Sequence, residues 1–169
     1  VNRMEGGGDV GRAWWSTCQL RYRNHLVMPG LATRTAEVDH SLADARIGAI
    51  GELDDEVYAA WNGTASQSPK LYKYNNTSDT WGTALTQSMT DQVTDTITWT
   101  AINGTTYIVF AHYDANASPG GYTYSSNGTS WTTDTTYGTE FLTVWDDRLW
   151  GISNAGQLWW AIAAGAETL

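Results

Sequence analysis

The sequence has little positive charge and no long apolar run. Nine basic residues stand against 18 acidic ones in 169, which gives a net charge of −9. Nucleic-acid binding depends on Lys and Arg that neutralise phosphates, so we exclude nucleic acid as the default partner. No apolar run approaches the roughly 20 residues that a membrane helix needs, and no signal-peptide-like region stands at the start. We therefore expect no membrane span.

The residues of metal and hydrolytic sites are also scarce. Cys18 is the only cysteine, which excludes an intramolecular disulfide. His25, His40 and His112 share no metal-ligand spacing, and no serine lies in a nucleophile elbow. The sequence therefore predicts no metal, no cofactor and no hydrolytic triad.

Aromatic residues that carry a polar atom are abundant. Ten Trp and nine Tyr stand against two Phe, and such rings suit half-exposed surfaces. Thr, Ser, Gly and Asn dominate the rest of the chain, whereas the strong helix formers Lys and Glu are sparse. This composition favours strands and turns, and we expect everything after about residue 47 to be β.

A short motif recurs along the chain: an apolar residue, a polar turn, and an apolar or aromatic restart. It occupies residues 53–58, 102–107 and 145–150. A short polar turn between apolar runs predicts a β-hairpin, and we assign the pairs at 54–55 and 146–147 to such turns. Tyr74 and Tyr124 lie about 50 positions apart, as do Trp81 and Trp131. That period indicates a repeat architecture.

Each copy is predicted to be four short antiparallel strands, the pattern of a propeller blade. The first unit covers about residues 47–88, the second about 96–137, and the third begins at Phe141. The third unit stops where a fourth strand would begin, and Trp14 and Trp15 are candidates for a closing strand from the N-terminal part. The chain thus holds three clear blades and a partial N-terminal one, or it is a fragment or one subunit of a larger ring.

The first part of the chain differs from the repeats. Six of the seven arginines lie within residues 1–46, which contain no regular pattern. We divide the chain into residues 1–46, an irregular N-terminal arm or partial blade for docking or closure, and residues 47–169, the propeller blades.

Three segments carry a resemblance to known repeat families. The sequences YKYNNTSDTW at 72–81 and YTYSSNGTSW at 122–131 resemble the third strand, turn and fourth-strand Trp of kelch and Asp-box propellers, although Ser126 stands where the Asp box has Asp. The phrase around 144–160, with VWDDRLWGI and GQLWW, is similar to propeller lectins. The resemblance covers about residues 47–162 and implies an all-β fold of β-propeller-like blades with four antiparallel strands each.

The aromatic residues are the remaining functional signal. Indole and phenol rings cover the apolar faces of sugars, so the leading hypothesis is a non-enzymatic, lectin-like module that binds a surface ligand, with carbohydrate as the leading candidate. The repeated residues Tyr58, Tyr107 and Trp150 are expected to be core. The predicted ligand-binding residues are Trp61, Trp99, Trp145 and Trp160.

Two alternatives remain open. In the first, the chain is a structural or adhesin subunit of a larger assembly, such as a virion or phage tail, and docks onto a protein partner or a second copy through residues 1–46. This places it outside the cell or on a virion surface. The Asp-box likeness implies a sialidase-like glycosidase, but such enzymes bring three arginines together and only Arg148 lies within the repeats, so we rank this reading last.

Overall fold

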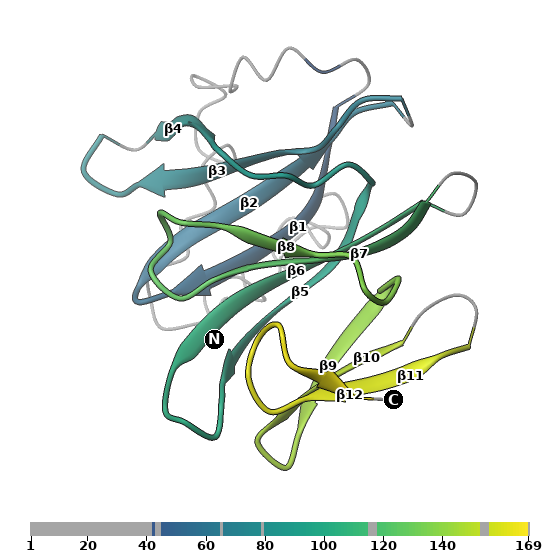
Figure 1. The fold of residues 1–169 in the computed structure, drawn as a ribbon. Helices are drawn as coiled ribbons and strands as arrows, with labels where there is room; N and C mark the ends of the chain where they lie inside the picture. The colour runs from purple at the N-terminus through teal and green to yellow at the C-terminus, as the bar shows by residue number, and fades with distance from the viewer. Residues whose placement is uncertain are drawn as a thin grey trace, which may run out of the picture. The chain divides into compact units, whose positions relative to one another are not determined.

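The computed structural model describes residue 42 and residues 45–64, 66–78, 80–114, 118–152 and 156–168. In these residues the chain is all-β, without a helix, and twelve strands form three four-stranded antiparallel sheets (Figure 1). All of them belong to one compact unit, Asp39–Leu169. The predicted fold class and strand number per repeat are confirmed, and the propeller arrangement stays a prediction. The boundary predicted at residue 46 also stays a prediction, because the described residues barely extend before it.

Each sheet is a meander in which strands consecutive in the sequence pair with each other. The first sheet contains β1 (Arg46–Leu53), β2 (Glu56–Asn62), β3 (Lys70–Asn75) and β4 (Thr80–Leu85). The second contains β5 (Val93–Thr100), β6 (Thr106–Asp114), β7 (Ser118–Ser125) and β8 (Thr132–Asp134). The third contains β9 (Phe141–Trp145), β10 (Arg148–Ile152), β11 (Leu158–Ala161) and β12 (Glu167–Thr168).

The hairpin turns follow from their residues. Asp54 and Asp55 have φ of 52° and 63°, and Asp146 and Asp147 have φ of 54° and 57°. Two successive residues with positive φ form the type I′ turn, whose twist matches that of the flanking strands. The Asp pairs are therefore turn formers, as predicted. The second hairpin uses the longer loop 101–105, in which Gly104 has a φ of 82°.

The third sheet corrects one expectation. Its fourth strand comes from the chain itself, because β12 pairs with β11 through Thr168 opposite Trp160 and Glu167 opposite Ala161. The expectation that an N-terminal strand is needed here was wrong, since a two-residue strand after a tight turn leaves no alternating pattern to detect. Trp14 and Trp15 lie outside the described residues.

The sheets pack on one another through two apolar clusters. Between the first and second sheets, Tyr58, Leu71 and Phe110 belong to one buried cluster. Between the second and third sheets, Trp99, Val109 and Trp159 belong to the other. Full burial of one large apolar side chain contributes about 1.5–3 kcal/mol, so these joints hold the stack together.

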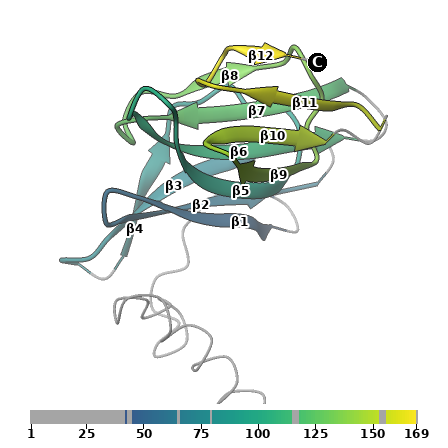
Figure 2. The same cartoon turned by 90° about the horizontal axis from the view of Figure 1, so that it is seen from below.

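The backbones of neighbouring sheets approach each other along their first strands, β1 with β5 and β5 with β9 (Figure 2). Polar bonds fix the two joints. The Asn62 side chain donates to Val93 O and accepts from Val93 N, both at 2.8 Å. At the other joint, Leu142 N donates to Asp95 Oδ2 at 2.9 Å. Each sheet is therefore held in a defined orientation on the next.

Candidate binding face

The third sheet has two unlike faces. In an antiparallel sheet, residues directly opposite each other share a face. Leu149, Trp159 and Ala161 point toward the second sheet and are fully buried, at 0% exposure. We call the other side the open face. Its residues form three rows across the strands: Phe141, Ile152 and Leu158; Thr143, Trp150, Trp160 and Thr168; Trp145 and Arg148.

Large apolar side chains are exposed on this face. Trp145 is 66% exposed, Phe141 55%, Leu158 52% and Ile152 44%. The first row is entirely apolar, and Arg148 is the only charged residue in the three rows. Isolated exposed apolar residues are normal on protein surfaces, but a contiguous group of them marks an interaction site.

Three indole rings run across the open face in contact with one another. The ring centroids of Trp145 and Trp150 are 6.1 Å apart, and those of Trp150 and Trp160 are 6.3 Å apart. The Arg148 guanidinium carbon lies 4.7 Å from the centroid of the Trp160 ring, a cation–π distance. Trp150 Nε1 donates to Trp145 O at 3.2 Å, which fixes the middle ring. The Arg148 guanidinium also lies 4.0 Å from Asp146 Oδ2, so the array presents a continuous aromatic surface with one paired cation.

The four predicted ligand-binding tryptophans separate into three environments. Trp145 and Trp160 come together on the open face. Trp61 lies on the first sheet, where its ring meets those of Tyr72 at 5.3 Å and Trp81 at 4.8 Å. Trp99 is 2% exposed and donates from Nε1 to the backbone oxygen of Asp147 at 3.0 Å. The expectation that Trp99 is exposed was wrong, because its ring fills the joint between the second and third sheets.

Trp150 was expected to be core, and it completes the array instead. Tyr58 and Tyr107 point toward the following sheet and pack in the two clusters between sheets. Trp150 points to the same side of the third sheet, since its neighbour Leu149 points toward the second. No further sheet follows among the described residues. The sequence feature that could have indicated this is that Trp150 belongs to the third copy of the repeat, which no further described sheet covers.

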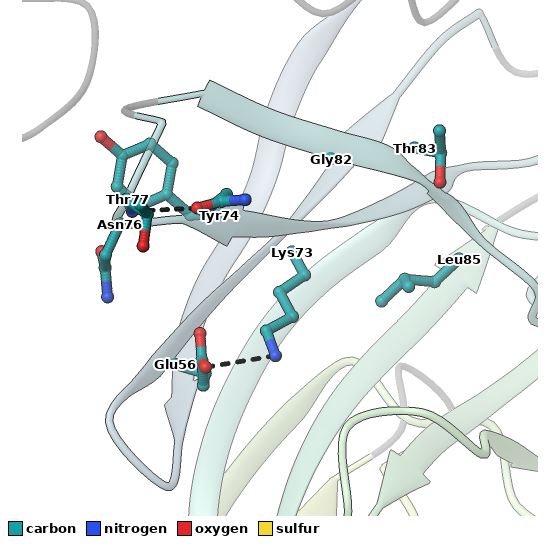
Figure 3. Close-up of a pocket in the computed structure, with 9 residues that line it drawn as sticks. Glu56, Lys73, Tyr74, Asn76, Thr77, Gly82, Thr83 and Leu85 are labelled. Atoms are coloured by element: carbon teal, nitrogen blue, oxygen red, sulfur yellow. Dashed lines mark hydrogen bonds and ion pairs between the residues drawn. The ribbon is translucent and has the colours of Figure 1, made fainter.

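A hollow lies on the first sheet, lined in part by Tyr74, Thr83 and Leu85 (Figure 3). Its charged groups pair with each other, because Lys73 Nζ lies 3.2 Å from Glu56 Oε1 with both side chains about 40% exposed. Exposed pairs of this kind contribute about 1 kcal/mol or less.

One buried chain of polar side chains resembles a catalytic relay. Asp91 Oδ2 lies 3.9 Å from His112 Nδ1, and His112 Nε2 lies 3.3 Å from Thr123 Oγ1. Burial lowers the pKa of His112 to about 4, against the opposing effect of Asp91, so the imidazole is neutral at pH 7. Both His112 and Thr123 are 0% exposed. A substrate cannot reach this hydroxyl, and the chain of groups is structural.

The described part of the chain contains few residues that could form other kinds of site. It contains no group of three His, Cys, Asp or Glu side chains able to hold a metal ion. Its only arginines are Arg46 and Arg148, so it does not supply the three arginines of a sialidase-like site. None of its segments is a helix of the length and apolarity needed to cross a bilayer.

Comparison of the chain with models of protein families, with curated proteins and with solved structures finds no match. The fold and the face define a class of architecture: an all-β protein of stacked four-stranded sheets with an open aromatic face at the third sheet.

Proposed function

We propose that this chain is a structural building block, a stack of propeller-type blades whose open face takes up a further β-sheet in a larger assembly. One observation carries the proposal. Tyr58 and Tyr107 on the first two sheets point to the side that the next sheet covers, and Trp150 occupies the same side of the third sheet. A repeat unit buries its faces against its neighbours, so the open face is suited to one more sheet.

The apolar area of the face supports the proposal. An aromatic side chain buries about 150–250 Å², so Trp145 at 66% exposure and Phe141 at 55% together expose roughly 180–300 Å². Ile152 and Leu158 add to the same patch. An apolar patch of a few hundred Å² on a protein surface is often a functional one. The extracellular or virion-surface setting expected from the sequence belongs to the same proposal.

The native mass of the purified chain tests the proposal. We expect a multimer in light scattering over a range of concentrations, and we expect Ile152→Asp to dissociate it. The variant loses about 1.5–3 kcal/mol of apolar burial and places a carboxylate in a dry interface. Each 1.4 kcal/mol weakens association tenfold. Ile102→Asp is the matched control, because Ile102 is an isoleucine on a turn with 70% exposure. A single-chain mass at every concentration contradicts the proposal.

Carbohydrate binding is the second candidate, favoured by the three indoles and by Arg148. Indole rings cover the apolar faces of sugars, and the Thr143 hydroxyl and the guanidinium supply polar groups at the edge. A glycan array tests it with wild type, Trp160→Ala and the control Trp61→Ala, whose indole lies on the first sheet. Binding that is lost only with Trp160→Ala supports a sugar on the open face. No binding by wild type eliminates this candidate.

A further inference from the structure

The hollow on the first sheet lies where this sheet departs from the repeat. Lys73 is opposite Tyr58 in the pairing of β3 with β2, so both side chains leave from the same face of the sheet. Tyr58 belongs to the buried cluster between the first two sheets. In the second sheet, the residue 50 positions further on is Thr123, which is 0% exposed and bonds to His112. The first sheet therefore has a cation where the second has a buried hydroxyl.

A bulge interrupts the strand pairing at the same point. The register of β3 and β4 shifts between Tyr72 and Tyr74. Lys73 therefore lies opposite two residues of the edge strand β4, Gly82 and Thr83, and both line the hollow. The equivalent strands of the second sheet, β7 and β8, pair in continuous register. Bulges at sheet edges often lie beside functional sites, because they change the direction of side chains.

Contacts around the hollow hold its walls in place. In the turn between β3 and β4, Asn75 Oδ1 accepts hydrogen bonds from Thr77 N at 2.9 Å and from Ser78 N at 3.1 Å. The ring of Tyr74 packs edge-on against Trp81, with centroids 5.3 Å apart. The hollow has a volume of about 440 Å³, and small-molecule sites measure roughly 300–1,000 Å³. It is therefore a preformed space of the size of a ligand site.

The groups that line the hollow select the chemistry of its ligand. Lys73 Nζ and Glu56 Oε1 lie 3.2 Å apart with both side chains about 40% exposed, and their charges cancel (Figure 3). An ammonium group donates up to three hydrogen bonds and a carboxylate accepts about four, so one mutual contact leaves both groups able to bind more. A hydroxyl group both donates and accepts, so it can bond to the two of them at once. Thr83 adds a hydroxyl and Leu85 an apolar side chain.

We infer that this hollow binds a neutral saccharide. Such a ligand offers several hydroxyl groups to the Glu56–Lys73 pair and the apolar face of its ring to Leu85. An anion would meet Glu56 as a like charge, and a cation would meet Lys73 in the same way. The site lies on the first sheet, apart from the open face of the third, so the inference goes beyond the proposed assembly and does not depend on it.

An array of neutral oligosaccharides tests the inference with four variants. Glu56→Gln and Lys73→Met each remove a charged partner of the ligand, and each is expected to weaken binding about tenfold or more. Lys70→Met is the matched control, because Lys70 is on the same strand but is not among the described residues that line the hollow. Trp160→Ala alters the open face, and we expect both it and Lys70→Met to bind as wild type does. The melting temperature of each variant shows that the fold is retained.

Each outcome decides the matter. Loss of binding with Glu56→Gln and Lys73→Met, but not with Lys70→Met or Trp160→Ala, supports a saccharide site in the hollow. Binding that is lost with Trp160→Ala and kept with Glu56→Gln and Lys73→Met places the saccharide on the open face and overturns the inference. A wild-type chain that binds no saccharide, or only anionic ones, overturns it too. The native mass is a separate measurement, so these failures leave the proposed assembly standing.

Discussion

Gly151 is tightly packed in the joint between the second and third sheets. A Cβ at Gly151 would lie 2.2 Å from both Cε2 and Cζ2 of Trp159. Trp159 cannot retreat, because its ring is stacked on Tyr122 with centroids 5.2 Å apart and is 0% exposed. Gly151→Ala therefore forces the indole or the strand to move. Overpacking a dense core in this way costs about 1–3 kcal/mol.

The cost converts into a measurable change in melting temperature. In chains of this size, 1 kcal/mol shifts Tm by about 2–4 °C, so Gly151→Ala is expected to lower Tm by about 2–12 °C. Circular dichroism or calorimetry measures the shift. Gly82→Ala is the control, since its added Cβ would meet only Lys73 O at 3.3 Å. Alanine is preferred to glycine inside a strand by about 0.5–1 kcal/mol, so this control is expected to leave Tm unchanged or raise it.

A double-mutant cycle separates the clash from other effects. Trp159→Phe removes the ring atoms that the new methyl group meets, so Gly151→Ala is expected to cost less in the Trp159→Phe background than in wild type. A Gly151→Ala variant that melts with wild type would refute the argument that Trp159 is held against Gly151. Equal costs in the two backgrounds would place the strain elsewhere.

Three other residues give shorter predictions. The buried neutral His112 makes the fold less stable in acid. The imidazole of the unfolded chain binds a proton below about pH 6.5, whereas that of the folded chain, with its pKa lowered to about 4, binds one only near pH 4. The free energy of unfolding is therefore expected to fall by about 3 kcal/mol as the pH is lowered through that window. Denaturation by urea at several pH values measures this slope, and His112→Gln is expected to remove most of it. Asn62→Ala leaves both backbone groups of Val93 unpaired in a buried joint, and a loss of about 2–4 kcal/mol in urea denaturation is expected; a change below 1 kcal/mol would contradict the role of this side chain. Asp55→Gly relieves a φ of 63° that costs a non-glycine residue about 1–2 kcal/mol, so Tm is expected to rise, and a fall would contradict the turn assignment.

The sequence alone determined the local architecture of this chain. Paired aspartates between apolar runs specify tight hairpins, and the repeated spacing of Tyr74 with Tyr124 and of Trp81 with Trp131 specifies equivalent strands. Both patterns can be read from the order of residues alone, without knowledge of tertiary contacts. The β12 strand escaped prediction because two residues carry no periodicity.

The tertiary structure decided which rings are buried and which are exposed. Trp99 and Trp145 have similar sequence surroundings, a strand end before a turn, yet Trp99 lies in a joint and Trp145 on the open face. Trp150 sits at the repeated position that packs toward the following sheet in the first two copies, and whether it packs in the same way depends on whether another sheet follows. Burial is a property of the packing of sheets distant in sequence, and composition and spacing alone do not contain it.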